Sequence, residues 1–125
     1  MRERLKDKNR LEHIQNAIDT ILERVEGMDY ETFKSDKILY GGIVYYTMII
    51  GEAAYKLSPQ FVQSYPEVMW QDIADMRHHL VHGYYQVDSS IVWAVVQHDL
   101  KPLRHQIDHL LYNINWEEWE NQNNV

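Results

Sequence analysis

Residues 91–111, IVWAVVQHDLKPLRHQIDHLL, decide the fold class of this chain. The β-branched residues that open this stretch would suit a strand if they stood alone. Apolar residues continue at three- and four-residue intervals as far as Leu111, which is the spacing of one helix face. We therefore predict a long helix that has Asp88 as its N-cap and is kinked at Pro102.

Two more helices are expected in the first half of the chain. Residues 3–26 carry one apolar stripe, and Gly27 suits the position just past a helix end. From about residue 36 to 57 the pattern is apolar on most sides, which is typical of a helix that is central or lies at an interface. Gly41 and Gly42 lower the helix propensity there, so a start after them is also possible.

The middle of the chain predicts a short helix followed by a longer one. Ser58 and Pro59 are typical of an N-cap followed by proline at the first helical position. A longer helix should then run from Trp70 and end at Gly83. Because no strand pair is recognisable, we predict an all-α fold, an up-and-down bundle of four main helices with a short extra helix.

Composition indicates one ordinary globular domain of 125 residues. The chain has no cysteine, which excludes disulfides and thiolate metal sites. No run of about 18 uncharged apolar residues occurs, so we expect no membrane segment and a cytoplasmic location. We assign residues 1–112 to the helical domain and residues 113–125 to an acidic C-terminal tail, whose Trp116 and Trp119 suit either an ordinary terminal helix or a docking segment.

The formal net charge of −7 argues against a broad electrostatic nucleic-acid surface. Charge is uneven, however, because residues 1–10 carry five Lys or Arg and only two acids. A contact with RNA would have to use this basic end together with the Arg/His cluster near residue 80. Tyr45 and Tyr46 are interpreted as core or dimer contacts, because a base-stacking role would require exposure.

The Arg/His cluster lies in DIADMRHHLVHGYY, residues 72–85. In an ideal helix Arg77 and His82 stand about 140° apart around the axis. They can converge only if the helix unwinds at His82 or if a second copy of the chain supplies the other half. His78 and His82, four residues apart, share a helix face.

Three interpretations of this cluster compete. The side chains could simply complement the dipole at the end of a helix. His78 and His82 have the spacing of metal ligands, but the glutamate of H-E-x-x-H is missing and Arg77 would oppose a cation. The third interpretation is chemistry on a phosphodiester, with His82 as acid or base and Arg77 holding the phosphate.

Glu52 is an acid within an apolar run. A carboxylate is costly to bury unless it is paired. Glu52 is therefore either an exposed residue of its helix or a partner that tunes Arg77 or His82.

The segment RHHLVHGY, residues 77–84, resembles the R-x-x-x-x-H-x-Y motif of HEPN domains, specifically the HepT-like toxins of HEPN/MNT toxin–antitoxin systems. The segments IGEAAYKLS and DIADMRHHLVHGYYQVDSSIVWAVVQHDLKPL extend this resemblance over most of residues 8–111. Position 78 departs from it, because His78 stands where asparagine is common. The segment after Tyr112 has no counterpart in the resemblance.

The resemblance implies a two-fold homodimer in which two R-x-x-x-x-H motifs line a shared cleft. It implies a metal-independent endoribonuclease toxin without a cofactor, in a type VII-like system. Arg77 and His82 would be catalytic, with His78 and Glu52 in support, and the MNT nucleotidyltransferase antitoxin would adenylylate Tyr84. The rival interpretation is a non-catalytic dimeric module that binds a nucleotide or a partner protein through the same cleft.

Overall fold

The computed structural model describes residues 6–82 and 88–123, and only the backbone path of residues 77–82. Every regular element in this part of the chain is helical, which confirms the predicted all-α class. The four main helices are α1 (Asp7–Val25), α3 (Lys37–Tyr55), α5 (Trp70–His82), and α6 (Ser89–Ala94) continued through the π-helical segment η1 (Val95–Asp99) into α7 (Leu100–Asn113). Short helices complete the chain: α2 (Tyr30–Ser35), α4 (Pro59–Ser64) and α8 (Trp116–Asn123).

Side-chain caps fix where several helices begin. The predicted N-cap Ser58 is confirmed, because its Oγ accepts a hydrogen bond from the Phe61 N–H at 3.2 Å, and Pro59 follows at the first helical position. Asp88 is likewise confirmed as the N-cap of α6, accepting from the Ser90 N–H at 2.8 Å. Asp36 caps α3 at 3.0 Å from the Leu39 N–H, so α3 begins before Gly41 and Gly42 and runs through them.

The kink predicted at Pro102 stays a prediction. The π-helical segment η1 ends three residues before this proline. Within it the Leu100 N–H donates to the Val95 carbonyl, five residues back instead of four. Proline has no N–H to give, and its ring would crowd the carbonyl of the preceding turn in a regular α-helix. The wider π turn accommodates Pro102 without ending the helix.

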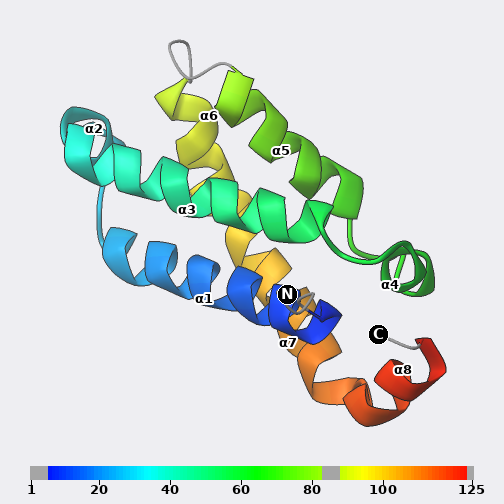
Figure 1. Cartoon of the computed structure of the whole chain (residues 1–125). Helices are drawn as coiled ribbons and strands as arrows, with labels where there is room; N and C mark the ends of the chain where they lie inside the picture. The colour runs from blue at the N-terminus through cyan, green and yellow to red at the C-terminus, as the bar shows by residue number, and fades with distance from the viewer. Residues whose placement is uncertain (1–5, 83–87, 124–125) are drawn as a thin grey trace.

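The core lies where α1, α3 and α7 meet, and α5 covers the other flank of α3 (Figure 1). α1 and α3 run side by side, while the long α6–α7 helix passes behind them (Figure 1). Most of the fully buried side chains come from α1, α3 and α7, as the stripe patterns predict. They include Leu11, Ile14, Ile18, Ile21, Ile50, Leu100 and Ile107.

An aromatic cluster closes one end of the bundle around the fully buried ring of Phe61. Trp116 stacks on Phe61 at 5.9 Å between centroids, and Trp119 meets it edge-on at 5.5 Å. Lys6 of the N-terminal end reaches Glu120 of α8 at 3.2 Å. The acidic C-terminal segment therefore packs as an ordinary helix on α4 of its own domain.

Candidate active site

Arg77, His78 and His82 lie on the C-terminal half of α5. The backbone of α5 stays helical through His82, so Arg77 and His82 occupy positions about 140° apart around the helix axis. Their side chains, and the whole of Tyr84, lie outside the described residues. The described backbone ends at His82 itself, so both routes to convergence, unwinding at His82 and a second copy of the chain, stay predictions.

The neighbouring helix α3 sets the surroundings of α5. α5 packs along α3 more extensively than any other pair of helices in the described structure. Its C-terminal end lies toward the end of the bundle that holds α2 and α6, as Figure 1 shows. A site at residues 77–82 is therefore bordered by the N-terminal half of α3 and by α6.

Glu52 is a partly exposed residue of α3. Its Oε1 lies 3.1 Å from Nζ of Lys56, one helical turn further on. A carboxylate that keeps contact with water and with an ammonium carries a modest desolvation cost. The support of Arg77 or His82 by Glu52 stays a prediction.

A groove of about 280 Å³ runs between α1 and α3 beside Glu52. We call it the Arg10 groove; it is lined by Arg10, His13, Tyr45, Met48, Ile49, Glu52 and Ala53. Of these residues, sequence reasoning identified only Glu52 as a site residue. The excess of basic residues at the N-terminal end could have indicated Arg10 from the sequence. His13 and Tyr45 come to the same groove only because α1 and α3 are in contact.

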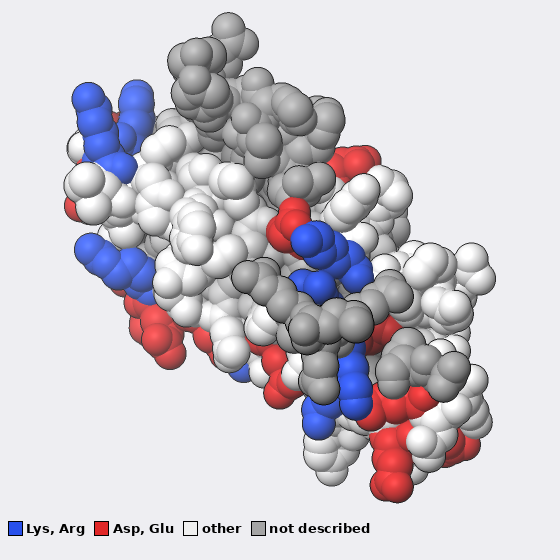
Figure 2. Space-filling view, in the orientation of Figure 1, with Lys and Arg blue, Asp and Glu red and all other residues white. Residues whose placement is uncertain are grey.

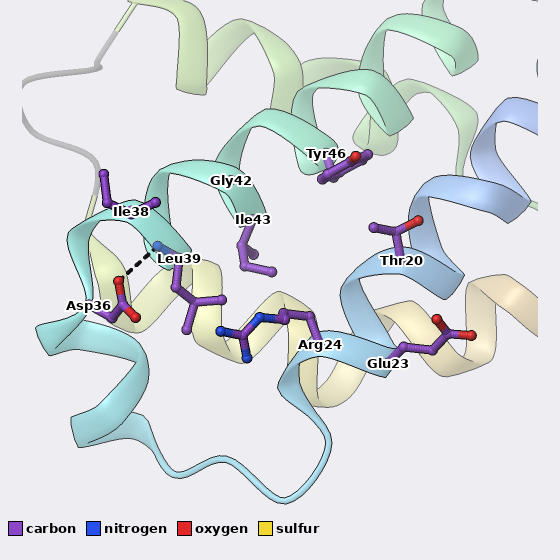
Figure 3. Close-up of a pocket in the computed structure, with 9 residues that line it drawn as sticks. All are labelled: Thr20, Glu23, Arg24, Asp36, Ile38, Leu39, Gly42, Ile43 and Tyr46. Carbon is purple, nitrogen blue, oxygen red and sulfur yellow. Dashed lines mark hydrogen bonds between the residues drawn. The ribbon is translucent and has the colours of Figure 1, made fainter.

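A larger groove of about 580 Å³ lies between the C-terminal half of α1 and the N-terminal half of α3. We call it the Arg24 groove, and its lining residues are drawn in Figure 3: Thr20, Glu23, Arg24, Asp36, Ile38, Leu39, Gly42, Ile43 and Tyr46. Arg24 extends from α1 across the groove toward Leu39, whereas Glu23 points away (Figure 3). The lining holds no histidine, so it lacks a group that exchanges protons near neutral pH.

Among residues 6–76 and 88–123, whose side chains are described, no three His, Asp or Glu side chains gather in a way that could hold a metal ion. The proposed His78 and His82 ligand pair lies outside this range. In the same part of the chain, His105 and His109 are exposed on α7, in line with the solvated face that their polar neighbours suggest.

Comparison with known proteins adds to this geometry. A family model described as "Ribonuclease HepT-like" matches residues 14–110. "Putative RNase TTE0752" of Caldanaerobacter subterraneus subsp. tengcongensis is 35% identical over 101 residues, which cover 81% of this chain and 90% of that protein. "Probable ribonuclease HepT" of Thermococcus cleftensis is 33% identical over 103 residues, covering 82% and 94%. No solved structure matches the chain.

The chain belongs to the HepT-like ribonuclease family. The HepT-like match runs from within α1 to within α7 and therefore includes the Arg77–His82 segment and Glu52. The match ends at residue 110, before α8, so the helix that contacts Phe61 is not part of the matched range. None of the described helices combines the length and hydropathy needed to cross a bilayer.

Proposed function

We propose that this HepT-like protein is the endoribonuclease toxin of a HEPN/MNT toxin–antitoxin pair and cuts RNA without a metal ion. The observation that carries the proposal is membership of a ribonuclease family together with the segment R-H-H-L-V-H-G-Y at residues 77–84. Arginine and histidine are the two side chains that such a reaction needs at neutral pH. The proposal assigns them to Arg77 and His82.

The reaction proceeds by attack of an RNA 2′-hydroxyl on the adjacent phosphorus. The 2′ oxygen forms a bond to phosphorus, the bond from phosphorus to the 5′ oxygen breaks, and the 5′ oxygen takes up a proton. His82 acts as general base for the 2′ proton or as general acid for the 5′ oxygen. Arg77 holds two phosphate oxygens and stabilises the charge that builds up on them, while His78 and Glu52 support the pair.

The proposed active unit is a two-fold homodimer. The exposed side of α3 carries apolar residues, including Ile38, whose side chain is 87% exposed. Ile38 stands at the Arg24 groove (Figure 3), and Figure 2 shows a mainly uncharged surface over this half of α3. In a two-fold contact the same patch serves both partners, so Ile38 of each copy can cover the groove of the other. Such a contact would bring together the C-terminal halves of the two α5 helices.

Incubation of the purified protein with total RNA in the presence of a chelator tests the proposed reaction. Wild type should cut the RNA, and His82→Ala and Arg77→Ala should each lose about 100-fold or more in rate. His105→Ala, an exposed histidine on α7, is the matched control and should cut like wild type. Equal cutting by all variants would refute both assignments, and cutting that needs added zinc would favour the metal interpretation.

A non-catalytic dimeric module that binds a nucleotide or a partner protein is the second candidate function. The net charge of −7 favours it, because an acidic chain gains little from unspecific contact with RNA. In the chelator experiment this candidate predicts no cutting by any form of the protein.

We also propose that Tyr84 is where the antitoxin acts. An MNT nucleotidyltransferase would transfer AMP from ATP, with magnesium, to the phenol oxygen, and pyrophosphate would leave. The added phosphate would occupy the phosphate site of Arg77 and repel the RNA backbone. Mass spectrometry of protein co-expressed with a nucleotidyltransferase encoded beside it should find AMP on Tyr84. A silenced complex with an unmodified Tyr84 would mean inhibition by binding alone.

A further inference from the structure

The Arg10 groove has the composition of a binding site for a small anion attached to a flat group. Its α1 side holds two nitrogen-rich side chains, Arg10 and His13, and its α3 side holds the ring of Tyr45. The remaining lining is largely apolar, from Met48, Ile49 and Ala53. Its volume of about 280 Å³ lies at the small end of the range for ligand pockets, which suits one base or one nucleotide.

Arg10 is a charged residue of this groove whose guanidinium has no ion-pair partner among the described residues. Its Nε is buried and makes no hydrogen bond, and its guanidinium forms no ion pair with any described residue. A half-buried cation that no described residue pairs has lost part of its hydration without a gain from these residues. A phosphate in the groove would give the terminal nitrogens of the guanidinium ionised acceptors, while the buried Nε stays out of its reach.

Tyr45 provides an aromatic surface next to this cation. Its side chain is 58% exposed, which is the condition that a base-stacking role requires and that the sequence could not reveal. An edge-on contact with Tyr46, at 5.5 Å and 74°, holds the ring in a defined orientation. A base that stacks on this ring therefore meets a platform that is already ordered.

The acid in the groove restricts where a phosphate can lie. Glu52 repels anions, but its charge is balanced by Lys56 at 3.1 Å. The phosphate therefore belongs on the α1 side, near Arg10 and exposed His13. The Glu52 oxygens suit N–H donors of a base or a 2′-hydroxyl, which RNA offers and DNA lacks at the sugar.

The surface beside the Arg10 groove carries basic side chains with acidic ones among them (Figure 2). Basic side chains gather where the C-terminal end of α3 faces the N-terminal end of α1, as Figure 2 shows in the orientation of Figure 1. Lys6 and Lys56 belong to these two ends, and each keeps about half of its side chain exposed. Both lysines are paired with glutamates, Lys6 with Glu120 and Lys56 with Glu52, so Arg10, which forms no ion pair with a described residue, supplies the local attraction for a polyanion.

We propose that the Arg10 groove binds one nucleotide of single-stranded RNA outside the cleaved bond, with its phosphate on Arg10 and its base on Tyr45. The proposal rests on the proposed function, because it treats the RNA as the substrate whose cleavage occurs at Arg77 and His82. The groove lies on the α1 side of α3, and α5 packs on the other flank of the same helix, so the RNA strand must pass over α3 to reach both places. The groove then contributes affinity and selection of the RNA without taking part in bond cleavage.

The test measures the affinity of a fluorescently labelled single-stranded RNA at several salt concentrations in chelator. A His82→Ala background prevents cutting, and the cleavage assay on the wild-type background is run separately. Arg10→Gln should weaken binding about tenfold and lower the slope of log K against log salt by about 0.7, the value for one phosphate on a single strand. Arg10→Lys, which keeps the charge, should retain the slope.

Tyr45→Ala should weaken binding at least fivefold, the lower end of what one stacked base contributes, and Tyr45→Phe should bind like the parent. The matched controls are Lys101→Gln and Tyr112→Ala, both exposed on α7, and neither should change the affinity. Unchanged binding by both groove variants would overturn the proposal even if the wild type cuts RNA. Weakened binding in Arg10→Gln alone would overturn the base contact. If the protein bound RNA as predicted but never cut it, the proposed RNA binding in the groove would stand and only the nuclease assignment would be refuted.

Discussion

Glu52 and Lys56 form an ion pair on α3, with 3.1 Å between Oε1 and Nζ, at the edge of the Arg10 groove and on the helix that packs against α5. Exposed pairs four residues apart contribute only about 0.3–0.5 kcal/mol to stability. The pair therefore has little structural value, which makes a functional role of Glu52 separable from folding.

Glu52→Gln should lower kcat/KM for RNA cleavage about tenfold, or about 1.4 kcal/mol in the barrier. The reason is that, in its proposed supporting role, the Glu52 carboxylate would stabilise the imidazolium of His82 that forms when the 2′ proton is taken up. The acidic limb of the pH–rate profile should also move to lower pH, a change that a merely structural residue would not cause. Lys56→Gln is the control and should keep the wild-type profile; if both variants shift it equally, Glu52 has no role of its own.

The contact between α1 and α7 depends on Arg104. Its Nε donates to Asp19 Oδ1 at 2.6 Å and its Nη2 to Asp19 Oδ2 at 3.0 Å, and Nη1 reaches Asp108. Asp19→Asn should lower the free energy of unfolding by about 1 kcal/mol, since a bidentate pair in a network exceeds an isolated surface pair. Urea unfolding measures the change, and Glu120→Gln, which breaks only the pair with Lys6, should cost less.

The hydrogen bond from Arg104 to Asp19 raises the pKa of Arg104 above its ordinary value. A group with a raised folded-state pKa contributes stability that is present below its unfolded pKa and is lost only as pH rises through the folded value. The contribution of Arg104 should therefore stay constant from neutral to moderately alkaline pH. A difference between wild type and Asp19→Asn that shrank between pH 7 and 9 would contradict this.

The docking of α8 should be measurable as stability. Trp119 is nearly fully buried against Phe61 and Tyr65, so Trp119→Ala should lower the free energy of unfolding by about 3 kcal/mol through lost burial and a cavity. Tyr112→Ala, at an 89% exposed position just before α8, should change it by less than about 0.5 kcal/mol. Equal stability of the two variants would mean that α8 does not hold its place in solution.

The proposed homodimer predicts that Ile38→Glu weakens self-association at least tenfold, because it places a charge in an apolar contact. Light scattering over a range of protein concentrations checks this, and RNA cleavage should fall in parallel. Ile91→Glu, a comparable exposed isoleucine on α6, is the control for a general effect of charge. A wild-type protein that stays monomeric at micromolar concentration would refute the dimer outright.

Periodicity was the main signal for the helices, because each buries apolar residues at helical spacing. The caps of α4 and α6, Ser58 and Asp88, could be predicted from local chemistry. The Arg10 groove could not be predicted in this way, since it depends on how α1 and α3 approach each other. The same holds for Trp119, whose partners lie more than fifty residues earlier in the chain.

In the candidate site, too, some residues could be identified from the sequence and others only from the folded structure. Arg77, His78 and His82 form a local pattern on one helix, and the sequence alone identifies them. The exposure of Tyr45 and the missing partner of Arg10 are properties of the folded surface, and they change the interpretation of Tyr45 from a packing residue to a candidate RNA contact.

The chemical nature of the new 3′ end of cleaved RNA tests the central claim most directly. Attack by the 2′-hydroxyl, with Arg77 holding the phosphate and His82 moving the proton, leaves a 2′,3′-cyclic phosphate and a 5′-hydroxyl. Mass spectrometry of the products formed in chelator should therefore find the cyclic phosphate, or the monophosphate that it becomes on hydrolysis. A 3′-hydroxyl with a 5′-phosphate would show that water or a metal-bound hydroxide is the nucleophile, and would contradict the proposed reaction.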